Sequence, residues 1–365
     1  MKLSIGIVGL PNVGKSTLFN ALTKKSVPAE NYPFCTIDPS VGIVAVPDER
    51  LGKLSTFSNS AKTIPAVVEF VDIAGLVAGA SKGEGLGNKF LSHIRETDAI
   101  AEVVRIFEDD KIIHVEGAID PIRDVGVINT ELMLADMETV AKRLVNIEKD
   151  VKRGDKTAIF EKTVLEKALK FLDGGLLISG QNFAPEEKAV LSQIHLITGK
   201  PVLYVLNKKA GAKNLDETGD ERFSALVKFF KETGADYVVV DAKIEDELKD
   251  FEGTEKETFR RELGGAEDGI NAFIAASYSL LGLITYFTTG EDETRGWTIK
   301  KWSTAPEAGM AIHNDFKNKF IRAEVIFWKD LLGVGSYTEA RSKGLVRTEG
   351  KEYVVKDGDV IEFKI

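Results

Sequence analysis

Short apolar runs alternate with segments of helical character along most of the chain. Five of these runs are typical of buried parallel strands and cover residues 3–8, 67–71, 99–104, 202–206 and 237–240. Helical stretches lie between them, so the pattern predicts a doubly wound α/β domain. Such domains bind ligands at the carboxyl ends of their strands, and the polar motifs described below follow strand ends.

A coiled-coil spacing interrupts this pattern in the middle of the chain. Apolar residues recur there at alternating intervals of three and four residues: Met137, Val140, Leu144, Ile147 and Val151. After the polar stretch 152–155, a second helical run places four leucines on one face: Leu165, Leu169, Leu172 and Leu176. The heptad seam favours two antiparallel helices closed by a tight turn. Both helices are highly charged away from their seams, which favours a projecting arm over a pair of ordinary packing helices.

The character of the chain changes again after about residue 279. Short β-type segments at 285–288 and 297–299 precede a short helix near 308–316. The last segment, 353–363, alternates on both sides of Asp357-Gly358, which predicts a β-hairpin. Together these features predict a small mixed β/α domain of about 85 residues.

Composition narrows the class of protein. The chain has 365 residues and one cysteine, Cys35, which excludes a disulfide framework and fits a reducing compartment. The first strand begins at once, without the features of a signal peptide, and no apolar stretch approaches the roughly 20 residues needed to span a bilayer. We therefore expect a cytoplasmic protein that does not bind membranes.

Charge is unevenly distributed along the chain. The net charge of −9 argues against a protein that coats nucleic acid through bulk positive charge. Two segments are less acidic than the rest: residues 279–365 carry 13 Lys and Arg against 13 Asp and Glu, and residues 129–198 carry 10 against 11. If a partner rich in nucleic acid exists, these two segments are its more favourable contacts.

A glycine-rich motif follows the first strand. Gly9 and Gly14 are separated by four residues, and Lys15 and Ser16 follow. This spacing between a strand and a helix predicts a phosphate-binding loop, in which backbone N–H groups and a helix N-terminus bind the anion. Lys15 then reaches the outer phosphates, and Ser16 holds Mg²⁺. The predicted nucleotide contacts are Asn12, Val13, Gly14, Lys15, Ser16 and Thr17.

Two further motifs fit a nucleotide site with a metal ion. Asp72 ends the strand 67–71, where an aspartate orders the Mg²⁺ shell, and Gly75 follows three residues later, where its N–H can meet a γ-phosphate. Thr36 lies in a loop between the first helix and the second strand. A threonine there would cap both Mg²⁺ and the γ-phosphate.

These motifs together resemble one known family. The segments 9–17, 31–36, 72–76, 83–91 and 107–110 are similar to those of the Obg-like ATPases of the YchF family. The C-terminal segments around Ala305-Pro306, Asp315-Phe316, 320–323 and 356–359 resemble that family's TGS domain. The resemblance extends over essentially the whole chain and includes the order of its domains.

The resemblance implies a fold and a partner. The fold is an α/β phosphate-loop NTPase with an inserted helical coiled-coil hairpin and a C-terminal TGS domain of β-grasp type. The implied segments are 1–128 and 199–278 for the two parts of the nucleotide-binding domain, 129–198 for the hairpin and 279–365 for the TGS domain. The implied partner is the ribosome, contacted through the hairpin and TGS domains, rather than DNA. The implied substrate is ATP.

The residues after the fourth strand allow a physical test of this substrate. Guanine is read by the aspartate of an Asn-Lys-x-Asp motif, whose carboxylate accepts hydrogen bonds from the base. This chain has Asn207-Lys208-Lys209-Ala210, and Ala210 cannot accept those bonds. ATP is therefore favoured, with Asn207 and Lys208 as nucleotide contacts. The family that this chain resembles usually has glutamate at position 210 and a residue other than lysine at 208, so the chain departs from that family's pattern there.

Hydrolysis needs a group that positions water. Many GTPases use a glutamine where this chain has Leu76, and leucine cannot do so. His114 occupies the position of the family's mobile-loop histidine, and an unperturbed histidine titrates near neutrality. We predict Lys15, Gly75 and His114 as catalytic groups, and Ser16, Thr36 and Asp72 as metal ligands. Asn12 either helps to bind K⁺ beside the phosphates or caps its own loop.

Three functions stay open at this point. The first is a slow Mg²⁺-dependent ATPase whose nucleotide state controls binding to the ribosome. The second is a translation-associated GTPase, which Asn207-Lys208 weakly favours and Ala210 opposes. The third is a ribosome-binding adaptor that holds nucleotide without meaningful turnover, because the water-orienting glutamine is absent.

Overall fold

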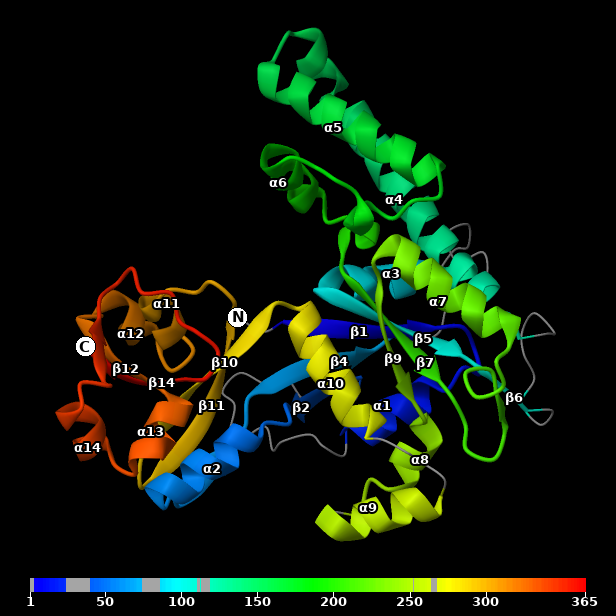
Figure 1. Ribbon diagram of the computed structural model, residues 1–365. Coiled ribbons are helices and arrows are strands. Elements are labelled where there is room, and N and C mark those ends of the chain that lie inside the picture. The colour runs from blue at the N-terminus through cyan, green and yellow to red at the C-terminus, as the bar shows by residue number, and fades with distance from the viewer. Residues whose placement is uncertain are drawn as a thin grey trace.

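The computed structural model describes residues 3–23, 40–73, 86–109, 112, 119–251, 253–263 and 268–365. A six-stranded sheet forms the centre of its larger body (Figure 1). The strands lie in the order β2 (Val41–Ala45), β4 (Val67–Asp72), β1 (Ser4–Gly9), β5 (Ala99–Arg105), β7 (Val202–Asn207) and β9 (Asp236–Val240). The five predicted strands are present and parallel to one another. The edge strand β2, which the apolar pattern did not reveal, runs antiparallel to β4.

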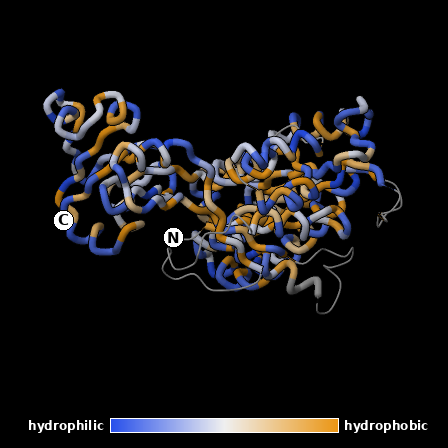
Figure 2. The backbone as a smooth tube through the Cα atoms, turned by 90° about the horizontal axis from the view of Figure 1, so that it is seen from below, coloured by the Kyte–Doolittle hydropathy of each residue, from blue (hydrophilic) through white to orange (hydrophobic). Residues whose placement is uncertain are grey.

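Helices cover both faces of this sheet, so the doubly wound prediction is confirmed. They are α1 (Lys15–Thr23), α3 (Leu86–Glu96), α7 (Glu221–Thr233) and α10 (Gly269–Leu280), while α8 (Ala242–Glu247) packs against α1 and is followed by α9 (Gly253–Glu262) away from the sheet (Figure 1). Successive residues of β7 lie on opposite faces of the sheet. Val205 belongs to the same core cluster as Phe273 of α10, whereas Tyr204 stacks on Phe230 of α7. Figure 2 shows hydrophobic residues gathered in the interior of this body.

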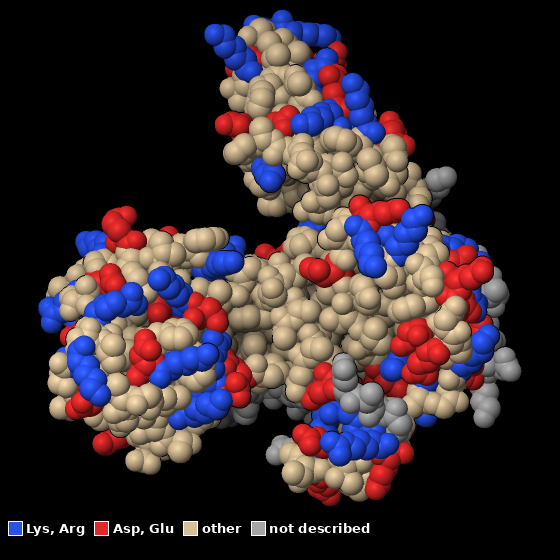
Figure 3. All heavy atoms as spheres, viewed as in Figure 1, with Lys and Arg blue, Asp and Glu red and all other residues tan. Residues whose placement is uncertain are grey.

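A helical arm projects from this body (Figure 1). It consists of α4 (Pro121–Lys152), α5 (Lys156–Asp173) and α6 (Pro185–Ile194), with 3₁₀ turns at Ile178–Gly180 and Ile197–Gly199. The turn between α4 and α5 contains Gly154 at φ 81°, and the side chain of Asp155 accepts a hydrogen bond from the N–H of Ala158. The predicted antiparallel hairpin is confirmed, and Figure 3 shows charged side chains along the arm.

The seam of the arm follows the predicted heptad with one exception. Val140 and Ile147 of α4 pack with Leu165 and Leu172 of α5 in one buried cluster. The prediction was wrong for Leu176, which lies beyond the end of α5 and is 46% exposed. The reason is local, because α5 ends at the glycine pair 174–175 and the leucine spacing continues past it.

The return of the chain from the arm is anchored by one buried carboxylate. Asp136 of α4 is fully buried, and its oxygens accept hydrogen bonds from the N–H groups of Ile197 and Thr198 and from the Thr198 hydroxyl. Burial raises the pKa of Asp136, while these hydrogen bonds oppose the shift. The arm is therefore attached to the sheet domain by specific bonds at its base.

A second six-stranded sheet forms the C-terminal domain. Its order is β13 (Arg347–Glu349), β12 (Arg322–Phe327), β14 (Asp359–Lys364), β10 (Leu283–Thr289), β11 (Glu293–Lys300) and β3 (Lys62–Ile64). The helices of this domain are α11 (Ala305–Gly309), α12 (Asn314–Asn318), α13 (Trp328–Val334) and α14 (Tyr337–Ser342). The single helix predicted near 308–316 is thus two short helices, because the chain turns between them at 310–313.

The predicted C-terminal hairpin is wrong. β14 pairs with β12 and β10, and Val354 forms only an isolated bridge with Thr304. The turn at Asp357-Gly358 instead leads into β14, which lies between β12 and β10. The Gly358 N–H donates to the Thr285 carbonyl, and the Asp357 side chain accepts from the Thr285 N–H. Apolar alternation is the same for a hairpin and for a strand inserted into a sheet, so the sequence did not separate them.

Part of the N-terminal sequence lies with the C-terminal domain. β3 pairs in parallel with β11, and α2 (Glu49–Ser58) contacts β10, β11 and α13. Arg50 binds both Asp48 and Asp357, with a guanidinium–carboxylate distance of 2.5 Å to the latter. β3 therefore joins the second sheet and α2 packs against it, although both precede β4 of the first sheet. The segment boundaries given from sequence stay a prediction.

Two smaller features complete the described chain. β6 (Phe107–Glu108) and β8 (Lys213–Asn214) form a two-stranded antiparallel ribbon. Among the helices in the described ranges, none combines the length and the apolar character that crossing a membrane requires.

Candidate nucleotide-binding site

The glycine-rich motif forms a tight loop between β1 and α1. β1 ends at Gly9 and α1 begins at Lys15, and Asn12 adopts the left-handed conformation at φ 65°. The first N–H groups of a helix have no intrahelical acceptor, and the helix dipole makes this end positive. The loop is therefore built to bind an anion at the carboxyl end of β1.

Gly14 is required by a neighbouring side chain as well as by the backbone. Its φ is 98°, and a Cβ atom placed there would lie 2.1 Å from Nδ2 of Asn207. That amide nitrogen donates a 2.7 Å hydrogen bond to the Val13 carbonyl. Only glycine leaves room for this bond.

Asn207 connects the loop to the end of the sheet. Its side chain is buried, and its Oδ1 accepts a hydrogen bond from the Ala242 N–H at 3.0 Å. One amide thus joins the phosphate loop to the β9–α8 turn. The sequence predicted Asn207 as a nucleotide contact, and the structure adds this bracing role, which motif spacing did not reveal.

Replacing Asn207 with alanine is expected to lower the free energy of unfolding by about 2–4 kcal/mol, since it leaves the Val13 carbonyl and the Ala242 N–H without their partners. Urea denaturation without nucleotide measures this change. Asn20→Ala on the exposed face of α1 is the matched control and should change stability by less than about 0.5 kcal/mol. Equal effects of the two substitutions would contradict the brace.

Lys15 and Asp72 come from adjacent strand ends. Burial lowers the pKa of the Lys15 ammonium, and the negative charge of Asp72 opposes this shift. Asp72 ends β4 and pairs with Ile7 of β1. Its Oδ1 is buried and has no hydrogen-bond partner within the described residues. A buried oxygen of this kind beside an anion-binding loop fits an Mg²⁺ site, and Ser16 lies exposed in the first turn of α1.

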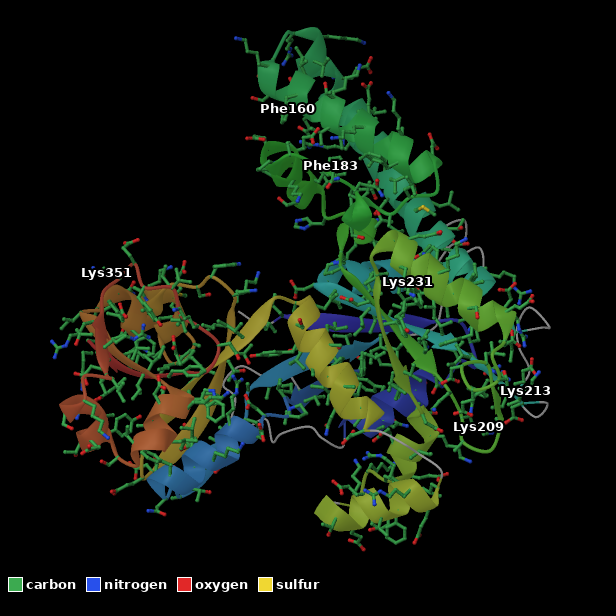
Figure 4. The ribbon with its side chains drawn as sticks, in the orientation of Figure 1. Phe160, Phe183, Lys209, Lys213, Lys231 and Lys351 are labelled. Atoms are coloured by element: carbon green, nitrogen blue, oxygen red, sulfur yellow. The ribbon has the colours of Figure 1, made fainter. Side chains whose placement is uncertain are left out.

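The segment 207–210 is held by ion pairs and by one carboxylate. The ammonium of Lys208 lies 2.9 Å from Glu217, and that of Lys209 pairs with Asp109. The Ala210 N–H donates a 2.5 Å hydrogen bond to Asp241, which also caps α8 through its other oxygen. Figure 4 labels Lys209 near the end of the sheet that carries this segment. Asp241 was not predicted from the sequence, although an aspartate between a strand and a helix is a recognisable N-cap.

Three predicted site residues, Thr36, Gly75 and His114, lie outside the described residues, as does Leu76. The structure does show what holds the chain just before His114. The guanidinium of the buried Arg105 donates to the carbonyls of Phe107, Asp109 and Ile112 at 2.9–3.3 Å. Arg105 was not predicted from the sequence, although a charged residue at the end of an apolar strand run is a recognisable signal.

Comparison with family models and known proteins agrees with this geometry. Residues 4–125 match the model of the 50S ribosome-binding GTPases, and residues 283–365 match the YchF-GTPase C-terminal model, described as a protein of unknown function. Curated relatives named ribosome-binding ATPase YchF include those of Bacillus subtilis, 53% identical over 364 residues, and of Haemophilus influenzae, 47% identical over 367 residues. Each alignment covers 100% of this chain and 99% of the relative.

A solved structure extends the similarity to three dimensions. The Schizosaccharomyces pombe YchF GTPase superposes with a TM-score of 0.88 at 38% identity, over 100% of this chain and 98% of that one. The phosphate loop, the inserted helical arm and the small C-terminal β domain are thus shared in the same order. The chain belongs to the YchF family.

Proposed function

We propose that this protein hydrolyses ATP to ADP and phosphate and that its nucleotide state controls binding to the ribosome. The observation that carries the proposal is the phosphate loop, braced by Asn207, in a chain about half identical over its full length to relatives named ribosome-binding ATPase. The helical arm and the C-terminal domain, which are less acidic than the rest of the chain, are the proposed ribosomal contacts.

The loop residues have distinct roles in this proposal. The N–H groups of residues 12–17 bind the phosphates, and the ammonium of Lys15 contacts the outer ones. Ser16, Thr36 and Asp72 hold Mg²⁺, and Asn12 contributes to a K⁺ site beside the phosphates. Held by these residues, Mg²⁺ would neutralise negative charge on the outer phosphates. Gly75 donates its N–H to the γ-phosphate, and His114 positions the attacking water.

Preference for ATP over GTP follows from position 210. Ala210 has no carboxylate to accept hydrogen bonds from guanine, so competition between non-hydrolysable ATP and GTP analogues should show tighter ATP binding. Ala210→Asp completes Asn-Lys-x-Asp and should raise GTP affinity about tenfold or more, as expected for hydrogen bonds to a charged group. Ala212→Asp adds the same charge two residues away and should leave GTP affinity unchanged. Equal affinities of the parent protein for ATP and GTP would contradict the ATPase assignment.

A GTPase is the second candidate. Asn207-Lys208 retains half of the guanine motif, and the S. pombe relative with the same fold is titled a GTPase. The analogue competition described above separates the two nucleotides directly, because a GTPase must bind the GTP analogue more tightly.

A further inference from the structure

The turn between β11 and α11 carries a tryptophan in an unusual setting. The Ser303 N–H donates to the Lys300 carbonyl at 3.2 Å, so residues 300–303 form a β-turn. Trp302 occupies its third position with φ 75° and is 75% exposed. The turn joins the last residue of β11 to the C-terminal helical region (Figure 1).

Neither packing nor backbone preference explains a tryptophan at this position. The third position of a turn with positive φ favours glycine or asparagine, because a Cβ atom is strained there. An indole in a core would bury most of its surface, whereas Trp302 leaves three quarters of its surface in solvent. A strained, exposed aromatic residue points to a role in binding.

Three lysines lie near this tryptophan along the backbone. The Lys301 ammonium lies 5.5 Å from the centre of the Trp302 ring, and Lys300 precedes it. The bridge between Thr304 and Val354, together with a hydrogen bond from the Val355 N–H to the Ser303 carbonyl, places Lys356 on the strand segment alongside. In the part of the chain that the structure describes, these three lysines are exposed and form no ion pair.

Two carboxylates that lie close to these lysines in the sequence, Asp357 and Glu307, already have partners. Asp357 binds Arg50 and the Thr285 N–H, and Glu307 accepts from the Thr304 N–H at 2.8 Å. Glu352 is exposed. We call Lys300, Lys301, Trp302 and Lys356 the Trp302 patch. It is positive in a protein whose net charge is −9, which favours an anionic occupant.

We propose that the Trp302 patch binds a single-stranded segment of ribosomal RNA, with a base stacked on the indole ring and phosphates beside the lysines. Exposed aromatic rings flanked by lysines are the usual means of holding unpaired bases. A protein partner would bury Trp302 among apolar neighbours, whereas its sequence neighbours here are lysines and a serine. The inference rests on the ribosomal association proposed above and specifies which kind of molecule this patch contacts.

The test uses the full chain and a fluorescein-labelled single-stranded RNA of mixed sequence, about 12 nucleotides long. Trp302→Gly should lower its affinity for this RNA by roughly 5- to 100-fold, and Trp302→Phe should retain most of it because the ring is kept. Phe259→Ala, at another exposed aromatic residue in α9 and outside both proposed ribosomal contacts, is the matched control and should bind like the parent. Replacing Lys300 and Lys301 by alanine should reduce the dependence of affinity on salt.

The Trp302→Gly variant should also keep the fold and the ATP hydrolysis of the parent protein. Its melting temperature should not fall, since glycine fits the left-handed turn, and its ATP hydrolysis without ribosomes should equal that of the parent. Co-sedimentation with ribosomes should weaken. A lowered melting temperature would show that Trp302 has a packing role and overturn the inference.

Other outcomes separate this inference from the proposed function. If Trp302→Gly binds the RNA and the ribosome as the parent does, the inference is wrong and the ATPase assignment stands. If the variant loses ribosomes but keeps RNA affinity, the occupant is a protein surface, and the RNA assignment is overturned. If the parent fails to sediment with ribosomes in every nucleotide state, the proposed ribosomal function fails.

Discussion

Replacing Lys15 with alanine is expected to lower kcat/KM for ATP hydrolysis by about 10²- to 10³-fold, the loss typical of removing one group that stabilises developing negative charge. The ammonium lies at the first residue of α1, partly buried, where water screens it less than at an open surface. Burial lowers the pKa of this ammonium, and the negative charge of Asp72 opposes the shift. Phosphate release over a range of ATP concentrations measures the effect.

The same substitution should leave the fold intact. Lys15 is not part of the hydrophobic core, so the thermal unfolding of Lys15→Ala without nucleotide should match that of the parent. Lys228→Ala, on an exposed face of α7, removes the same charge far from the loop and should not change hydrolysis. Parent-like turnover by Lys15→Ala would move the active site away from this loop.

Replacing His114 with alanine is expected to lower kcat by about 10²- to 10⁴-fold, the usual contribution of a group that positions or deprotonates water. ATP affinity should change little, because the interaction is made mainly in the transition state. Leu76 leaves the water-orienting role to another residue, and Arg105 holds the backbone only two residues before His114, at Ile112. Single-turnover hydrolysis with and without ribosomes, together with equilibrium binding of an ATP analogue, measures both quantities.

The control for this prediction is His93→Ala, since His93 lies in α3 and should not affect hydrolysis. We expect slow turnover by the parent protein alone and faster turnover with ribosomes. If His114→Ala hydrolyses ATP at the parent rate in both conditions, His114 does not act on the water. If the parent protein itself shows no turnover in either condition, it is a nucleotide-holding adaptor rather than an ATPase.

Local spacing predicted much of this fold correctly. The five parallel strands were visible as apolar runs, and the arm was visible as a heptad, because burial on one or both faces imposes a period on the side chains. The phosphate loop was equally recognisable, because its backbone path requires glycines and the anion that it binds favours a lysine such as Lys15. The exposed Leu176 shows the limit of such periods, which can continue past the end of a helix.

Pairing between distant segments was not readable in this way. The alternation of 353–363 fits a hairpin and an inserted strand equally well, and only the neighbours β10 and β12 decide between them. β3 is too short to be recognised alone, and its place beside β11 depends on the C-terminal domain being folded. Arg105 and Asp241 were not predicted, because their roles depend on which backbone groups their side chains hydrogen-bond in the folded chain.

The sequence by itself therefore determined the elements, their order and the chemistry of the phosphate loop, because each of these depends on residues a few positions apart. Only the tertiary structure decided that Asn207 binds the carbonyl of Val13, 194 residues earlier, and that Gly14 must leave room for it. It also placed β3 in the second sheet and left Trp302 exposed in a turn whose following residues, 303 and 304, pair with 354 and 355. These contacts form when folding brings distant segments together and buries or exposes their side chains, and no local spacing encodes which segments will meet.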